Sequence, residues 1–162
     1  MKYKLLSILF LVSTLSSNEL QIKANNFNGD ENTGISVFTG NVKIKKLNDE
    51  LNASKVTVYT NKQKEPTKFV AVGNVSFHIQ TKEKTIYEGV SKKAIYIPAT
   101  KEYHFFKDVH LKQVGDKKEI IGDEVLLKTI EGKAYAKGAE SEPVIMIFNI
   151  ADDKNTSKEQ QK

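Results

Sequence analysis

The sequence predicts an all-β fold of short antiparallel strands, and three observations lead to this prediction. After the first 17 residues, no stretch has apolar side chains at the i, i+3, i+4, i+7 spacing of an amphipathic helix. Apolar and polar residues alternate with a period of two from end to end, as in half-buried strands. A Gly-Asn-Val motif at Gly40 also returns 33 residues later at Gly73, inside a second alternating run.

Composition limits the class of protein. The chain of 162 residues suits one domain of ordinary size. Hydrophobic residues make up 39% and charged residues 28%, which excludes both a disordered chain and a multi-span membrane protein. All 25 basic residues are lysines, which lack the planar fork that suits tight phosphate or base recognition. The formal charge of +5 therefore does not indicate nucleic-acid binding.

The N-terminal segment has the layout of a secretory signal peptide. Lys2 and Lys4 precede an apolar run over residues 5–15, and small residues follow. This run is shorter than the roughly 20 residues that span a bilayer, so we expect cleavage of residues 1–17; a retained anchor is the alternative. Loss of both lysines lowers the charge from +5 to +3. Because the chain has no cysteine, the exported domain must be stabilised by a core and not by disulfides.

Each alternating run has one apolar and one polar face. Val75, Phe77 and Ile79 lie on one face of their run, whereas Ser76 and His78 lie on the other. We expect the apolar faces to form the interior of the domain, where they either fill a core or line a groove. The predicted interior residues are Phe38, Val42, Ile44, Val56, Val58, Phe69, Val75, Phe77, Ile79, Phe105, Val109, Leu111, Val125 and Leu127.

Turn residues and a second repeated marker divide the chain. The second marker includes residues 51–59, 87–97 and 121–127, and it alternates with the Gly-Asn-Val marker. Two alternating markers indicate a strand pair that is stacked repeatedly. The predicted turns are residues 61–66, 81–84, 97–102 and 114–118, together with Gly29-Asp30 and Gly115-Asp116.

The repeated glycine predicts a bend inside a continuing strand. Phe38 and Val42 share a face across Gly40, so the alternation continues through the glycine. Glycine inside a strand typically marks a bulge or sharp bend, and a bend at one level of every strand folds a sheet into a V or a roll. The alternative is a two-residue Gly-Asn hairpin turn. Lys107 takes the glycine position in the third copy, which favours the bend because lysine fits a left-handed turn poorly.

Residues with catalytic or metal-binding patterns are scarce. His104, Asp108 and His110 share a strand face and are the only such group, and solvated outer-face positions explain them better than a metal site does. Adjacent acidic pairs such as Asp123-Glu124 point to opposite faces of a strand, which is wrong for paired carboxylate chemistry. We therefore expect neither an enzyme nor a metal or other cofactor.

Four segments carry a resemblance to a known family. They are the pattern from Gly40 to Tyr59, which combines Gly-Asn-Val with L-x-A-x-x-V-x-V-Y, and the later runs GNVSFHI, KDVHL and IIGDEVLL. In these segments the chain resembles the OstA-like (LptA) family of periplasmic lipopolysaccharide transport proteins over residues 22–147. The departures from the pattern are Lys107 and an inserted residue within residues 87–97, which leave the strand register around Lys107 open.

The resemblance implies an open twisted β-jellyroll, a V-shaped roll of short antiparallel strands, over residues 18–150. It implies a periplasmic carrier that shields the acyl chains of lipid A in an apolar groove lined by the fourteen interior residues. The carrier would pass lipopolysaccharide from an inner-membrane export complex to an outer-membrane translocon. The expected partners are lipopolysaccharide and these transport components, with no nucleic acid.

Two other functions remain open. One is a lipid-free β-scaffold that joins partners edge to edge, and the other is a membrane-anchored relative of the same family. Small residues at recurrent strand positions leave room inside the roll and favour a groove: Gly73, Gly89, Gly122, Ala53, Ala94 and Ala134.

The first and last strands are predicted to be edges that pair with other chains. An open sheet leaves unpaired N–H and C=O groups at both ends. Residues 19–24 are short and contain no proline, and residues 143–150 are long and strongly apolar. Head-to-tail addition would extend the groove into an open oligomer; burial of the last strand within the roll is the alternative. The predicted partner residues are Leu20, Ile22, Val144, Ile145 and Ile147.

The polar tail and two short motifs complete the sequence. Residues 151–162 have no apolar residue after the first alanine, so we expect a disordered tail. Asn52 and Asn155 each follow an acidic residue at −2 in an extended glycosylation sequon, for which an ordinary polar turn is the alternative.

Overall fold

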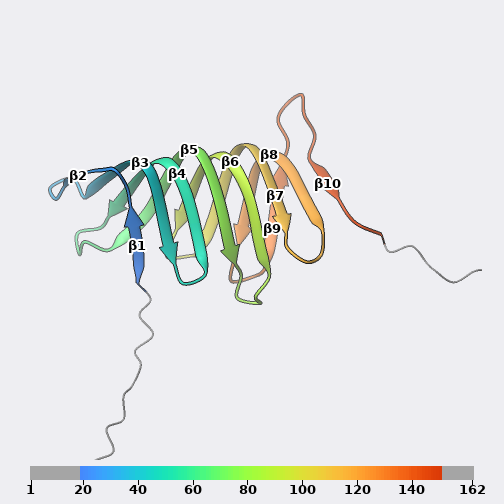
Figure 1. Ribbon diagram of the computed structural model, residues 1–162, viewed down its shortest axis with the longest axis horizontal. Coiled ribbons are helices and arrows are strands. Elements are labelled where there is room, and N and C mark those ends of the chain that lie inside the picture. Colours follow the sequence, from blue (N-terminus) through green and yellow to red (C-terminus); the bar gives the residue numbers. More distant parts are fainter. Residues whose placement is uncertain (1–18, 151–162) are drawn as a thin grey trace, which may run out of the picture.

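The computed structural model of the protein describes residues 19–150, and these residues form ten β-strands (Figure 1). The predicted signal peptide, the polar tail and Asn155 lie outside the described residues. The strands are β1 (Leu20–Lys23), β2 (Asn26–Asp30), β3 (Ile35–Lys46), β4 (Asp49–Thr60), β5 (Pro66–Gln80), β6 (Ile86–Ile97), β7 (Glu102–Gln113), β8 (Lys118–Lys128), β9 (Lys133–Lys137) and β10 (Ile145–Ile147).

All ten strands belong to one antiparallel sheet. The six long strands, β3 to β8, pair in chain order as a meander. At one end β1 and β2 both pair with β3, and at the other end β9 and β10 both pair with β8. The predicted all-β fold is therefore confirmed.

Each long strand bends near its middle, so the single sheet folds into two facing arms. The strands curve over along one edge of the ribbon in Figure 1, and the register of every pair from β3–β4 to β7–β8 shifts at that level. We call this line the corner and the opposite, hairpin-bearing side the mouth. The β1 arm contains β1, β10 and residues 42–53, 75–91 and 109–122, and the β2 arm contains β2, β9 and residues 35–39, 55–72, 93–106 and 124–128.

Consecutive left-handed residues form the corner in alternate strands. Gly40 and Asn41 have φ values of 79° and 48°, and Gly73 and Asn74 have φ values of 82° and 47°. Two adjacent positive φ values are the backbone of a tight hairpin turn, yet β3 and β5 continue on the far side. The prediction of a bend inside a continuing strand is correct, and the hairpin alternative is wrong.

The third copy of the corner uses non-glycine residues. Lys107 and Asp108 have φ values of 62° and 50°, and the β7–β8 register shifts between Phe106 and Val109. The bend in the third copy is therefore left-handed too, and the argument that lysine disfavours such a conformation was wrong. Pairing of β7 to both neighbouring strands before and after the corner holds Lys107 in a backbone region that costs a non-glycine residue about 1–2 kcal/mol.

Two further expectations need correction. Gly29 and Asp30 lie in β2 and not in a turn, because β2 pairs with β3 up to the contact of Asp30 with Ile35. The last strand is short: only Ile145–Ile147 form β10 within the apolar segment 143–150. Its side chains are exposed, so burial within the roll does not occur.

The two arms enclose a single apolar core. Val56, Ile79, Val109 and Leu127 are completely buried. Core residues come from both arms because the strands keep their alternation through the corner, so Phe105 in the β2 arm and Val109 in the β1 arm both point inward. Burial of each large aliphatic or aromatic side chain contributes about 1.5–3 kcal/mol.

The corner predicts opposite effects for two substitutions. Gly73→Ala places a Cβ atom 3.0 Å from the Ser54 side chain and forces alanine into a left-handed conformation, so we expect the free energy of unfolding to fall by about 1–2 kcal/mol. Lys107→Gly removes strain at the equivalent position and should raise this free energy by up to about 1 kcal/mol. Urea denaturation of both variants tests the corner, and a stability loss in Lys107→Gly would contradict it.

Candidate functional site

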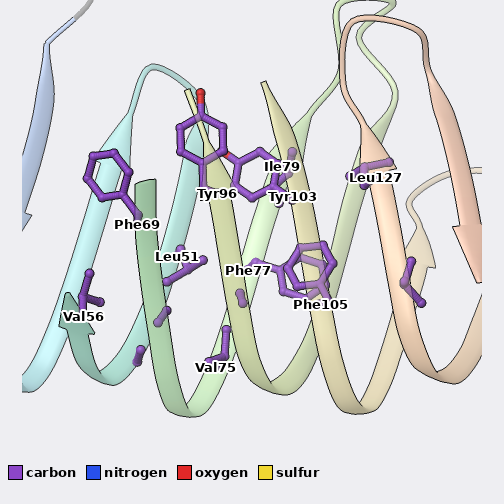
Figure 2. Packing of buried hydrophobic residues seen from close by; sticks show 14 of the residues in the cluster. Leu51, Val56, Phe69, Val75, Phe77, Ile79, Tyr96, Tyr103, Phe105 and Leu127 are labelled. Atoms are coloured by element: carbon purple, nitrogen blue, oxygen red, sulfur yellow. The ribbon is translucent and has the colours of Figure 1, made fainter. Parts of the chain in front are cut away.

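The interior contains a continuous line of aromatic rings. Phe69, Tyr96 and Tyr103 are cross-strand neighbours on β5, β6 and β7, with ring centroids 5.9 Å and 4.4 Å apart. Phe105 lies two residues beyond Tyr103 on the same face, and Phe77 of the opposite arm stacks on Phe105 at 3.9 Å. Figure 2 shows these rings between the two arms, with the Tyr96 hydroxyl toward the mouth. The aromatic line thus connects the mouth with the middle of the core.

The structure brings all fourteen predicted interior residues into this one core. Twelve are buried, whereas Phe38 and Ile44 are partly buried and pack against the others. The predicted interior list left out seven buried residues, although Tyr103 alternates with Phe105 on the apolar face and Ala53 and Ala94 were expected as small residues inside the roll. The buried residues outside the predicted list are Leu51, Ala53, Ala71, Tyr87, Ala94, Tyr96 and Tyr103.

The interior holds a small cavity beside the aromatic line. Its volume is about 30 Å³, roughly that of one water molecule, and its walls include Leu20, Ile44, Ala71 and Ala94. Small side chains therefore leave some room at this end of the roll. Gly89 does not, because a Cβ atom there would lie 2.6 Å from the Phe77 ring. The expectation that small residues leave space holds only in part.

Polar contacts join the two arms across the mouth. The Tyr103 hydroxyl donates to Asp49 Oδ2 at 3.0 Å, and Asp49 Oδ1 accepts a hydrogen bond from the Gln80 backbone N–H at 2.9 Å. Lys46 Nζ lies 3.5 Å from the Tyr96 hydroxyl. We call these two tyrosine contacts the mouth latch. Both contacts are made by side chains and not by paired backbone groups. Their loss therefore leaves the hydrogen bonds of the sheet intact.

Burial changes the protonation equilibria of the latch. Loss of hydration raises the pKa of the Asp49 carboxyl, although hydrogen bonds from Gln80 and Tyr103 and the nearby Lys46 charge oppose this change. Burial also raises the pKa of the Tyr103 and Tyr96 hydroxyls, which therefore remain neutral. Tyr103 donates to Asp49, whereas Tyr96 accepts from Lys46. The ionised Asp49 carboxylate is less stable in the protein than in water, and this lowers the stability that the latch contributes.

The outer face of the β1 arm carries ion pairs. Lys43 and Lys45 flank Glu50 at 2.9 and 3.2 Å and, through these hydrogen bonds, lower the pKa of Glu50 to about 2. His78 contacts Glu88 at 2.9 Å and His110 contacts Glu119 at 2.6 Å. These pairs are solvent-exposed and screened, so each contributes little to stability.

The three residues that share a face in the sequence are separated in the structure. His104 lies in the β2 arm beside Glu102, His110 lies in the β1 arm beside Glu119, and Asp108 lies at the corner beside Lys92. The corner between them sends the two histidines onto different arms. Within residues 19–150 no group of three or more His, Cys, Asp or Glu side chains could hold a metal ion.

Four of the predicted partner residues lie on the edge strands and Val144 directly precedes β10, and the five differ in exposure. Leu20 and Ile22 of β1 pack against the core, and Val144 is half-buried. Ile145 and Ile147 of β10 are 49% and 43% exposed. The C-terminal edge of the β1 arm therefore presents apolar side chains to solvent, whereas β1 presents mainly its backbone edge.

The folded sheet, its apolar interior and its latched mouth define an open β-jellyroll built around an apolar core. A family model described as "LptA/(LptD N-terminal domain) LPS transport protein" matches residues 21–133. The chain belongs to this lipopolysaccharide transport family, which is a family of transport proteins and not of enzymes. The predicted resemblance is thereby confirmed.

A solved structure shares the fold. The chain is similar to the crystal structure of LptH from Pseudomonas aeruginosa, described as the LptA-homologous periplasmic component of the lipopolysaccharide transport device. The TM-score is 0.72 at 15% sequence identity, and the match covers 82% of this chain and 96% of LptH. A search of curated proteins found no significant match. No helix in the described part of the chain is long and apolar enough to cross a membrane.

Asp49→Asn tests the electrostatics of the latch. The ordinary pKa of 3.8 applies to Asp49 in the unfolded chain and is raised in the folded protein, so ionisation destabilises the fold as pH rises through this interval. Asparagine does not ionise. We subtract the free energy of unfolding of the original protein from that of Asp49→Asn. This difference should increase with pH until the pH passes the pKa of Asp49 in the folded protein, and it should then remain constant.

Urea denaturation measures this difference at pH values from 3 to 8, in steps of about one pH unit. Glu50 and the other carboxyls with a lowered pKa make both proteins less stable as the pH falls. Subtraction of one protein's free energy of unfolding from the other's removes this shared effect. A difference that does not change with pH would show that burial does not disfavour the Asp49 carboxylate.

Proposed function

We propose that the protein is a periplasmic lipopolysaccharide carrier that shields the acyl chains of lipid A between its arms. It would receive lipopolysaccharide from an inner-membrane export complex and pass it toward an outer-membrane translocon. Membership of the lipopolysaccharide transport family supports the cargo. The apolar interior that opens toward the mouth carries the proposal of shielding.

Acyl chains require the arms to separate. The cavity of about 30 Å³ holds one water-sized group, so a chain of many methylenes enters only if interior side chains move aside. Each buried methylene contributes about 0.8 kcal/mol, whether it packs on protein or on lipid. Replacement of contacts between side chains by contacts with an acyl chain therefore changes the free energy little. The cost of entry lies mainly in breaking the polar contacts that cross the mouth, which are the mouth latch and the backbone hydrogen bond from Lys82 to Thr129.

The location and the partners follow from the same proposal. A cleaved signal peptide over residues 1–17 would export the chain to the periplasm. LptH, which shares the fold, is described as a periplasmic component of a lipopolysaccharide transport device. We infer that residues 18–150 form the carrier domain and that the transport components of both membranes contact its two sheet edges.

Edge pairing would extend the channel. The strand order ends at β1 on one side and at β10 on the other, and both belong to the β1 arm. The C-terminal edge of one copy would receive the N-terminal edge of the next, which gives an open head-to-tail oligomer. Apolar side chains at Ile145 and Ile147 support this proposal because they leave solvent on pairing.

Photo-crosslinking tests the shielding of acyl chains. A photoreactive residue in place of Phe77 or Phe105 lies within the aromatic line, and we expect it to capture purified lipopolysaccharide. The same residue at His78 or His104 lies on the outer polar face and should remain unreacted. Crosslinking is preferred to alanine substitution because loss of a buried phenylalanine costs about 3–5 kcal/mol and unfolds a marginal protein.

The pattern of crosslinks separates the functional alternatives. Capture only by outer-face probes would place the lipid on the wrong side of the sheet. Lack of capture by every probe, in a protein with unchanged circular dichroism, would favour the lipid-free scaffold. A full-length chain that stays in the membrane fraction with residues 1–17 attached would favour the anchored relative.

Proline substitution tests edge pairing. Ile145→Pro or Ile147→Pro removes a backbone N–H from β10 and should suppress large species in light scattering across a wide concentration range. Because β10 has only three residues, we expect the far-ultraviolet strand signal to change little. Ile147→Ala keeps the N–H and is the control for loss of the side chain alone. A strictly monomeric original protein would contradict the oligomer.

A further inference from the structure

A basin of about 610 Å³ lies at the mouth, directly outside the mouth latch. Both arms form its walls: Leu47 and Lys82 come from the hairpins of the β1 arm, and Lys101 and Ile130 come from the turns of the β2 arm. A backbone hydrogen bond from the Lys82 N–H to the Thr129 carbonyl joins the two walls at 3.0 Å. The basin is therefore a built feature where the arms meet and not a gap beside one loop.

The basin and the interior cavity lie on opposite sides of the mouth latch and share a wall. Four residues line both: Lys46, Asp49, Tyr96 and Tyr103. These are the residues of the mouth latch, with one face of each ring toward the core. A molecule that occupied both spaces would thus place one part among apolar side chains and the other part outside the latch, which is the geometry of an amphiphile.

The charges in the basin suit an anionic headgroup. Lys46, Lys82 and Lys101 bring three cations to its wall, and within residues 19–150 none of them forms an ion pair with a carboxylate. Asp49 is the acidic residue in the wall, and both of its oxygens already accept hydrogen bonds, from Gln80 and Tyr103. Leu47 and Ile130 are 70% and 43% exposed at the rim and give apolar contact beside the cations.

We propose that this basin binds the phosphorylated sugar headgroup of the carried glycolipid, with Lys46, Lys82 and Lys101 as the phosphate ligands. This inference rests on the proposed lipid-carrying function, because the acyl chains occupy the interior next to the basin. A phosphate group attracts Lys46 away from the Tyr96 hydroxyl, and the headgroup thereby loosens one contact of the mouth latch as it binds. Headgroup recognition and entry of the acyl chains are coupled in this way.

Binding of lipid A with and without its phosphates tests the basin. The probes are fluorescent lipid A that carries both phosphates and the same lipid A after enzymatic removal of the phosphates. In the double variant Lys82→Gln/Lys101→Gln, we expect affinity for the phosphorylated probe to fall by about tenfold, since two charge-assisted contacts from exposed lysines are together of this order. Affinity for the dephosphorylated probe should be unchanged.

A matched variant measures general electrostatic attraction. Lys55→Gln/Lys137→Gln removes the same charge from exposed lysines near the corner, on the β2 arm. We expect this variant to bind both probes as the original protein does. Inorganic phosphate, which has the charge but no acyl chain, should show no saturable binding at concentrations where lipid A saturates the protein.

Each other outcome contradicts a defined part of the proposal. Equal binding of both probes by the original protein and by the Lys82→Gln/Lys101→Gln variant would overturn the basin and leave the lipid carrier in place. If the Lys82→Gln/Lys101→Gln variant lost affinity for both probes equally, the lysines would act on the structure and not on the phosphate. An equal loss in the Lys55→Gln/Lys137→Gln variant would reduce the effect to net charge. Failure of the original protein to bind either probe would overturn the carrier function itself.

Discussion

The fold depends on the left-handed pair of residues at the corner of β3, β5 and β7. Hydrogen bonding to both neighbours means that a strand cannot bend alone, so the intervening strands β4, β6 and β8 bend at the same level. Because the alternation continues through the corner, one apolar face per strand becomes two facing walls. A flat sheet with this sequence would leave that face in water, whereas the folded sheet buries it against itself and needs no second layer.

In the proposed carrier the same residues would serve as core and as acyl-chain surface, which would set a limit on stability. The stacked rings of Phe77 and Phe105 stabilise the closed arms and would yield to an acyl chain. A large, well-filled core would resist such exchange. Here the arms are joined at the mouth by contacts that involve a carboxylate disfavoured by its own burial, Asp49. The contacts that oppose separation of the arms are thus weak at the mouth, where a ligand would enter in the proposed function.

The sequence predicted the sheet, its meander order and the direction of fourteen interior side chains, because all three follow from alternation and repeat. It did not predict the latch: Asp49 and Tyr103 are 54 positions apart and meet only when the arms close. The handedness at Lys107 was misjudged because pairing on both sides of β7 outweighs the local preference of lysine. β2 was taken for a turn because Gly29 has a strong local preference, which pairing with β3 overrides.

The use of lysine alone bears on release of the cargo. Arginine would hold a phosphate through two parallel hydrogen bonds, whereas lysine holds it as a hydrated point charge on a flexible stem. A carrier that binds a headgroup tightly cannot pass it on. Lys46 ends β3, Lys82 lies in the β5–β6 hairpin and Lys101 lies in the β6–β7 turn, so the three cations come from separate segments around one basin. In the proposed basin a headgroup would be held by several weak contacts of the same kind, and these can be released one at a time while the acyl chains remain between the arms.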